Sequence, residues 1–392
     1  MKGVLFSMEK FSKFTRENKL VIISLLAALL IFLGCSYILR PEKKEDAEYG
    51  DYAHYETAVV DTILKDTCIT DETLENNYRG EQMLIVSVKS GQYKGKQMQA
   101  FNYVGPLYGR PLSVGDKCTL IISTYADGTT RATVYEYARL VPIAIIVLLF
   151  FAATIAVGGK NGAKSLVGLI ITVLTLFMIL IPALMKGAPT LLTTFAICVY
   201  ISAVTYIIMD GIKTKTVCAW IGTISGMAMA VLFACLAQYL LRIDGYRMEN
   251  ADAILILRQT GTPIGIKGLM TAGVMISALG AVMDTAISLS SAVQEVHEAN
   301  KELKQRALFK SGMNIGRDIV GTMTNTLILA LLGSSLVLVI YIYSLGLETH
   351  QLMSSSYVAC EVVSTISSSI GVALAVPLTT LISSIAYANK KD

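Results

Sequence analysis

Eight apolar stretches, each long enough to cross a lipid bilayer, constrain this chain more than any other feature. They lie at about 20–39, 140–157, 165–184, 189–209, 216–241, 268–290, 318–345 and 357–388. A bilayer core of about 30 Å requires roughly 20 apolar helical residues. Backbone groups in lipid must also find partners within the segment. The sequence therefore predicts an all-α polytopic membrane bundle of about eight transmembrane helices, in keeping with 54% hydrophobic and 16% charged residues.

A polar region, residues 41–139, separates the first span from the other seven. It contains five strand-like runs, at 56–65, 82–89, 96–103, 117–124 and 131–137. Turn residues such as Ser90-Gly91 and Asp127-Gly128 stand between them. Several short strands in such a small region predict a closed β-barrel of the OB-like kind. We therefore expect three parts: 1–40 with the first anchor, 41–139 as the β-domain, and 140–392 as a seven-helix transmembrane domain.

The distribution of basic residues predicts the orientation of the chain, because cytoplasmic loops carry an excess of Lys and Arg. With the N-terminus inside, sixteen of these residues fall in inner segments and five in short outer loops. Both termini are then cytoplasmic, and residues 41–139 are extracytoplasmic. The net charge of +4 does not indicate a nucleic-acid partner, because the basic residues stand at the ends of apolar spans.

Several other chemistries are not indicated. The chain has three histidines and no CxxC spacing, so we expect no metal site. The segment 158–165, GGKNGAKS, departs from the phosphate-loop pattern at Ala163, and we interpret it as a turn between two spans. No nucleophile–base arrangement is present, so we expect neither an enzyme nor a cofactor.

The sixth span carries polar and small residues at helical spacing, which we call the polar strip. Its members are Gly273, Ser277, Gly280, Asp284, Ser288, Ser291 and Glu295. Steps of three and four place them on one side of a helix. An acid inside a membrane costs roughly 2.5–3.5 kcal/mol on insertion scales and normally faces protein or water. We therefore expect the polar strip to face the interior of the bundle, with Ser288 and Ser291 lining a path.

Asp284 has two interpretations. As a functional group it would carry a proton or a cation, or contact a substrate. The alternative is a structural carboxylate that accepts a hydrogen bond from a neighbouring helix. The high cost of an intramembrane acid favours the functional interpretation.

Asp318 opens the seventh span, and Gly321, Thr322 and Asn325 continue its helical face. It would couple to the same ion as Asp284, or serve as a helix N-terminal carboxylate with Asn314 as the cap. Asn325 lies deeper in the span, where an amide needs partners, so we expect it to hydrogen-bond across helices and line the path.

Glu361 begins a further stripe at helical spacing: Glu361, Ser364, Ser368, Gly371 and Ala375. It would act as an outer gate partner of the polar strip, or simply be a solvated charge at a helix end. Gly222 and Gly226 form a small-xxx-small motif, which predicts helix packing only. Residues 291–317, which contain the sequence QEVHEANKELKQRALF, predict a charged helix along the cytoplasmic face.

Two points about the cysteines remain open in the sequence. Cys68 and Cys118 would pair if their compartment is oxidising. The first span ends in LGCS, residues 33–36, which fits either an uncleaved signal anchor or a lipoprotein signal cleaved before Cys35.

Three segments resemble the YibE/F family of bacterial multi-span membrane proteins. They are GAVMDTAISLSSAVQEV (280–296), SGMNIGRDIVGTMTNTLILAL (311–331) and SSSIGVALAVPLTTLI (367–382). SGQYKG (90–95), SVGDKC (113–118) and the layout of one span, an outer β-domain and seven spans also resemble that family. The resemblance implies a multi-pass protein of the bacterial plasma membrane, of a kind often called permeases.

A fainter likeness is to half of a SecDF/RND-type protein. In that superfamily, carboxylates in the two helices flanking an inner segment relay protons, which implies such places for Asp284 and Asp318. This chain has two more spans than such a half.

The leading hypothesis is a secondary transporter, permease or proton- or cation-coupled membrane machine. Its site residues would be Asp284, Asp318, Asn325, Ser288, Ser291 and Glu361, and its partners the lipid bilayer and an ion or small substrate. The rival hypothesis is a non-transporting assembly or receptor protein, whose β-domain binds an extracytoplasmic partner. Either kind of protein would be compatible with an oligomer.

Overall fold

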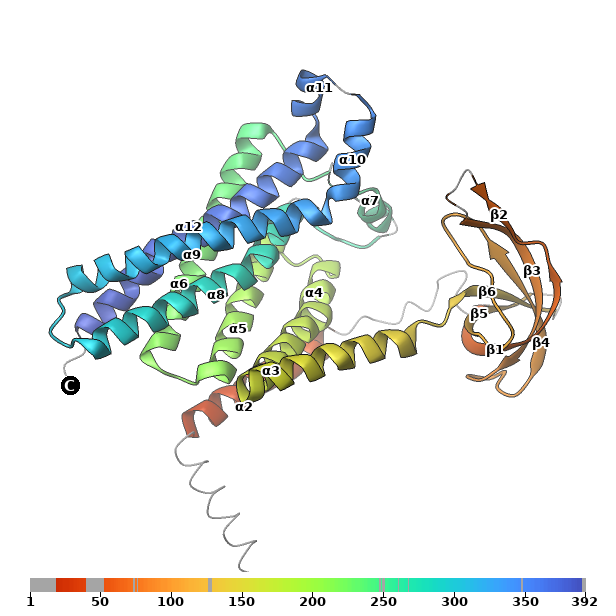
Figure 1. Cartoon of the computed structure of the whole chain (residues 1–392), viewed down its shortest axis with the longest axis horizontal. Helices are drawn as coiled ribbons and strands as arrows, with labels where there is room; N and C mark the ends of the chain where they lie inside the picture. The colour runs from red at the N-terminus through yellow and green to blue at the C-terminus, as the bar shows by residue number, and fades with distance from the viewer. Residues whose placement is uncertain are drawn as a thin grey trace, which may run out of the picture. The chain divides into compact units, whose positions relative to one another are not determined.

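The computed structural model describes residues 19–39, 53–72, 75, 77–125, 129–246, 248, 251–259, 261–266, 268–346 and 348–389. The chain divides into two compact units (Figure 1). One consists of Glu42–Ala156, and the other of Met1–Pro41 with Val157–Asp392. Each unit has a hydrophobic core of its own.

The first unit contains a closed β-barrel. Its strands are β1 (Ala53–Asp66), β2 (Ile69–Asp71), β3 (Asn77–Val88), β4 (Gln97–Val104), β5 (Lys117–Thr124) and β6 (Thr130–Tyr137). The order β1-β5-β6-β4-β3 is closed into a ring by pairing of β3 with β1, and β2 adds to β3 outside the ring. Among the described strands, only β4 and β6 pair in parallel. The predicted small barrel is confirmed, and the five predicted runs are the five ring strands.

The barrel core follows from the alternation of residues along its strands. In β3, Leu84, Val86 and Val88 are buried while the residues between them are partly exposed. They pack against Val60 of β1 and Leu120 of β5, among others. Period-two alternation is what a strand with one buried face requires.

The polar side chain of Gln82 is buried inside the barrel, with 1% of its surface exposed. Its Nε2 donates to the carbonyl oxygen of Leu112 at 3.1 Å and to Oδ2 of Asp66 at 2.8 Å. Its Oε1 accepts from the backbone N–H of Leu112 at 2.8 Å and from Nδ2 of Asn102 at 2.9 Å. Gln82 therefore holds the loop between β4 and β5 against the barrel.

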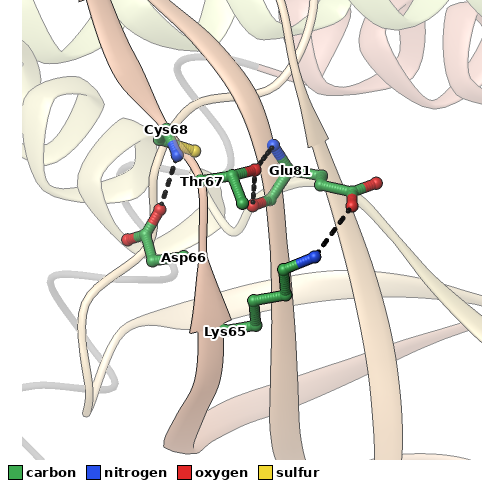
Figure 2. A network of polar contacts seen from close by, with 5 residues as sticks. All are labelled: Lys65, Asp66, Thr67, Cys68 and Glu81. Carbon is green, nitrogen blue, oxygen red and sulfur yellow. Dashed lines mark hydrogen bonds and ion pairs between the residues drawn. The ribbon is translucent and has the colours of Figure 1, made fainter.

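The end of β1 is joined to β3 by a network of polar contacts (Figure 2). The Thr67 hydroxyl donates to the carbonyl oxygen of Glu81 at 2.9 Å and accepts from the Glu81 N–H at 3.1 Å. Lys65 and Glu81 form an ion pair at 3.9 Å. A Cβ at Gly80 would come within 2.5 Å of the Thr67 carbonyl oxygen, so this close approach of two strands requires glycine.

Cys68 and Cys118 are free thiols, so the pairing that the sequence left open is not formed in this structure. The Cys68 N–H donates to Oδ1 of Asp66 at 2.8 Å (Figure 2). Burial, and then the hydrogen bond and negative charge of Asp66, raise the pKa of Cys68 from 9.0 to about 11. A raised pKa lowers the fraction of Cys68 present as thiolate, which is the reactive form. It also makes that thiolate a stronger nucleophile, which offsets part of the loss in rate.

We therefore expect iodoacetamide at pH 8 to alkylate Cys68 roughly tenfold more slowly than a cysteine in an unfolded reference peptide. The rate for Cys68 should rise in the variant Asp66→Asn, because one cause of the pKa shift is removed. Mass spectrometry of the digested chain measures both rates. Alkylation of Cys68 as fast as the reference peptide would contradict the described environment.

The second unit is helical. Helix α3 begins in the first unit and continues into the second. The helical elements are α2 (Lys19–Ile38), α3 (Leu140–Thr175), the π-helical turn η2 (Leu176–Leu180), α4 (Ile181–Met185), α5 (Thr190–Asp210), α6 (Thr214–Leu241), α7 (Ala251–Gln259), α8 (Leu269–Ala299), α9 (Gln305–Ser334), α10 (Leu336–Ser344), α11 (Thr349–Met353) and α12 (Ser356–Ala388). Among the described residues, six helices are long and apolar enough to cross a membrane. They are Leu140–Met185, α5, α6, α8, α9 and α12, and α2 contains a shorter apolar helix.

The longest of the six holds two of the predicted spans, 140–157 and 165–184. The turn predicted at 158–165 is a kink instead, because only Gly159 leaves helical geometry, at φ 53° and ψ −132°. Lys160, Ala163 and Lys164 are good helix formers, which explains why the helix resumes directly after the kink.

The prediction of a single helix along the cytoplasmic face at 291–317 is wrong. Helix α8 continues to Ala299 and α9 begins at Gln305, with a short turn between them. In this turn the Glu302 N–H donates to Oδ1 of Asn300 at 3.0 Å, a local bond that competes with helix formation. Asp318 consequently stands in the interior of α9 and not at its start, so Asn314 is not a cap.

Small residues allow α6, α8, α9 and α12 to pack closely. A Cβ at Gly226 of α6 would meet Ala375 of α12 at 2.7 Å and Val282 of α8 at 2.9 Å. Gly371 of α12 lies against Ala230 in the same manner. A Cβ at Gly316 of α9 would meet Val376. The interpretation of Gly222 and Gly226 as a packing motif agrees with these contacts.

Candidate functional site

The polar strip of α8 lies on one side of the helix, as its spacing predicts. Gly273, Gly280, Asp284, Ser288 and Glu295 are exposed, and Ser277 and Ser291 are half-buried. The opposite side of α8 packs against α5, α6, α9 and α12 and includes Ala278, Val282, Ala286, Leu289 and Val293, all fully buried. The helix therefore has one wholly packed face and one narrow open face.

The expectation that the polar strip faces the bundle interior is wrong for this chain. No described heavy atom lies within 4 Å of a Cβ placed at Gly273 or Gly280. The interior position is taken by the alanine, valine and leucine residues of α8, whose burial stabilises the bundle. Helical spacing fixes which residues share a face, but it does not determine which face a neighbouring helix covers.

Asp284 stands midway along α8, between Leu269 and Ala299. Its carboxylate forms no ion pair or hydrogen bond with the described part of the chain. A structural carboxylate would accept hydrogen bonds from a neighbouring helix, and the described residues supply no such donor.

A buried hydroxyl pair fixes the backbone immediately before Asp284. Tyr206 of α5 donates its hydroxyl to the carbonyl oxygen of Met283 at 2.8 Å and lies 2.6 Å from the Thr223 hydroxyl of α6. Thr223 in turn donates to the carbonyl oxygen of Ala219 at 2.9 Å. These contacts tie α5, α6 and α8 together one residue from the acid. These contacts were not predicted from the sequence, in which the available signal was a tyrosine within an apolar span.

Serine hydroxyls join α8 to α6 and α12 at two further levels. Ser277 and Ser368 of α12 lie with their hydroxyl oxygens 3.0 Å apart. Ser383 of α12 donates to the Ser290 hydroxyl at 3.3 Å, and Ser290 donates to the carbonyl oxygen of Lys215 at 2.8 Å. Of these residues only Ser277 belongs to the polar strip, and it connects that strip to the stripe beginning at Glu361.

Glu361 lies near the other end of the polar strip from Glu295. Its Oε2 accepts from the Ser335 hydroxyl at 2.9 Å, at the junction of α9 and α10. Glu361 and Ser364 line a cavity of about 190 Å³ together with Gly273 of the strip. Gly273 is eleven residues from Asp284, which is about 16 Å along a helix. The structure thus brings Glu361 to the strip, but not to Asp284.

Asp318 and Asn325 lie on the exposed face of α9. The opposite face of this helix, with Gly312 and Gly316, packs against α8 and α12. Leu289 of α8 lies beside Gly316, so Asp284 and Asp318 are at similar depths on adjacent helices. The cross-helix hydrogen bond expected for Asn325 is not found among the described residues.

Comparison with protein families gives a match for residues 146–389, to the family described as YibE/F-like protein. The chain belongs to the YibE/F family. Searches of curated proteins and of solved structures found no match.

The match covers more than half of this YibE/F protein and contains α5 to α12 entirely. All six predicted site residues therefore lie in the family region, whereas the barrel lies outside it. Together with the apolar helices, family membership identifies an integral membrane protein. The arrangement offers one carboxylate at mid-helix on an open polar face, with hydroxyl groups toward one end and a carboxylate-lined cavity toward the other.

Proposed function

We propose that this YibE/F protein is an ion-coupled transporter of the bacterial plasma membrane, in which Asp284 takes up and releases a proton or a cation. The observation that carries the proposal is an acid at the middle of a membrane-length helix without an intramolecular partner in the described chain. A group that changes charge must be reachable and must not be locked in an ion pair. Both termini would be cytoplasmic and the barrel extracytoplasmic.

The neighbouring residues support a path along α8. Ser288 is exposed one turn beyond Asp284, and Ser291 is half-buried one turn farther on. Their hydroxyls can both donate and accept hydrogen bonds, as water or an ion shell requires. At the other end, the cavity beside Glu361 gives the strip a second polar opening. We limit the coupling role to Asp284, because Asp318 lies on the face of α9 turned away from α8 and α12.

Reaction with a hydrophobic carbodiimide tests the proposal, because this reagent modifies protonated carboxyl groups in apolar surroundings. We expect the full-length protein in lipid vesicles to be modified at Asp284, and the yield to fall as the pH is raised. The variant Asp284→Asn should lose this label, whereas Glu295→Gln on the same strip should keep it. Mass spectrometry locates the modified residue. A protein left unmodified at Asp284 at every pH would refute the proposal.

The rival function, a receptor whose barrel binds an extracytoplasmic partner, is favoured by one observation. Tyr55 and Tyr135 are 61% and 58% exposed on the barrel surface. Their rings meet edge to face with centroids 5.4 Å apart. Exposed aromatic groups are common at binding surfaces. If Tyr55→Ala abolished the cellular function while Asp284→Asn left it intact, the receptor would replace the transporter.

A further inference from the structure

Helix α9 combines two properties that conflict in a lipid-facing helix. It is the least apolar of the six membrane-length helices, yet only 6% of the residues in its most apolar segment are buried. Its exposed polar face consists of Asn314, Arg317, Asp318, Gly321, Thr322 and Asn325. We call these residues the outer face of α9.

The charges on this face are unusual for a surface in contact with lipid. Within the described chain, the Arg317 guanidinium donates only to Oδ1 of Asn314 on its own helix, at 3.4 Å, and the carboxylate of Asp318 has no partner. Charged residues at membrane depth normally pair with one another or face protein. The first part of α3 is equally uncovered, but it is apolar throughout and suits lipid. The outer face of α9 therefore requires a covering surface that carries both signs of charge.

We propose that a second copy of this chain covers the outer face of α9, through a two-fold axis along the membrane normal. In such a dimer the two α9 helices run parallel. If residue i of the first copy contacts residue j of the second, then residue j of the first copy contacts residue i of the second. Arg317 and Asp318 are adjacent, so their depths differ by only about 1.5 Å. The Arg317 of each copy then lies at the right depth to pair with Asp318 of the other.

The next turns of the same face fit this arrangement. A Cβ at Gly321 would meet nothing within 4 Å, so another helix can approach its backbone closely. Asn325 would face the same residue of the second copy, where one amide donates and the other accepts. This also provides the cross-helix partner that Asn325 lacks within the described chain.

Other occupants fit less well. The apolar first part of α3 would leave both charges unpaired, and a lipid headgroup would satisfy Arg317 but not Asp318. Only a surface with an acid and a base at one depth satisfies both, and a second copy supplies it.

Charge exchange tests the pairing. Arg317→Asp places only acids on both sides of the interface, and Asp318→Arg places only bases there, whereas the double variant Arg317→Asp/Asp318→Arg restores complementarity. We expect the wild type to be dimeric in lipid vesicles by single-molecule photobleaching, each single variant to dissociate about tenfold more readily, and the double variant to recover. A monomeric wild type, single variants as dimeric as the wild type, or a folded double variant without recovery would each overturn the proposal.

Disulfide cross-linking avoids dependence on the folding of the charge variants. Asn325→Cys is made in a chain whose Cys35 and Cys235 are replaced by alanine, and its matched control is Leu232→Cys, 62% exposed on α6. Oxidation in native membranes should give a species of twice the 42.3 kDa chain mass for Asn325→Cys and not for the control. Equal cross-linking of the control, or a product of any other mass, would overturn the proposal.

Discussion

Leucine in place of Gly226 is expected to prevent the helical unit from folding. Even a single Cβ at this position would lie 2.7 Å from the Ala375 Cβ, 2.9 Å from Val282 Cγ1 and 3.1 Å from the Gly371 carbonyl oxygen. Because α6, α8 and α12 all meet here, no single neighbour can move aside. Added methylenes in a packed core cost about 1–3 kcal/mol, and leucine adds four heavy atoms where no space exists. We therefore expect almost no monodisperse protein in detergent extracts.

The measurement is the yield and the thermal stability of the fluorescently tagged chain in size-exclusion chromatography. Gly280→Leu is the matched control, since nothing lies within 4 Å of a Cβ at Gly280 and leucine favours the helix. The control should retain the wild-type elution profile. Equal yields for the two variants would show that α6 does not pack on α12 as described.

The variant Gln82→Leu is expected to release the loop between β4 and β5 from the barrel. Leucine has a similar size but leaves the N–H and carbonyl oxygen of Leu112, the amide of Asn102 and the carboxylate of Asp66 without the Gln82 contact. Each buried polar group without a partner costs about 1–3 kcal/mol. We expect a total destabilisation of the barrel of about 3 kcal/mol or more, and faster proteolysis within residues 105–116.

Limited proteolysis of the full chain, with mass spectrometry of the fragments, measures this effect. Gln99→Leu is the control, because Gln99 is exposed on β4. Its stability should change by no more than about 0.5 kcal/mol. Wild-type resistance of the Gln82→Leu loop to protease would mean that the Gln82 contacts do not hold the loop.

Much of the fold could be predicted from the sequence because its elements have strong local signals. The alternation of residues and the flanking turns predicted both ends of β5 correctly. They predicted the ends of the other ring strands within a few residues, except for the start of β3. Strand β2 was not predicted, because three residues are too few to show the period-two alternation of a strand. The start of the 318–345 span was placed too late, because charged residues end an apolar pattern without ending a helix.

The candidate site was predictable only in part. Spacing correctly grouped Asp284 with Ser288 on one face of α8, but it contains no information about which helices cover that face. The contact of Tyr206 with the Met283 carbonyl oxygen joins residues 77 positions apart and leaves no local pattern in the sequence. The exposure of the outer face of α9 was unpredictable for a related reason. Polar residues on one side of a helix are equally compatible with the lining of a bundle interior and with an interface between two copies of the chain.

The break at Gly159 divides the longest helical element into two parts of about membrane length. As a straight rod, its 46 residues would extend about 69 Å, more than twice the thickness of a bilayer core. A φ of 53° with a ψ of −132° is a conformation that glycine tolerates and other residues adopt only with strain. A residue other than glycine at position 159 would therefore favour one continuous helix, which is too long for the thickness of a single bilayer.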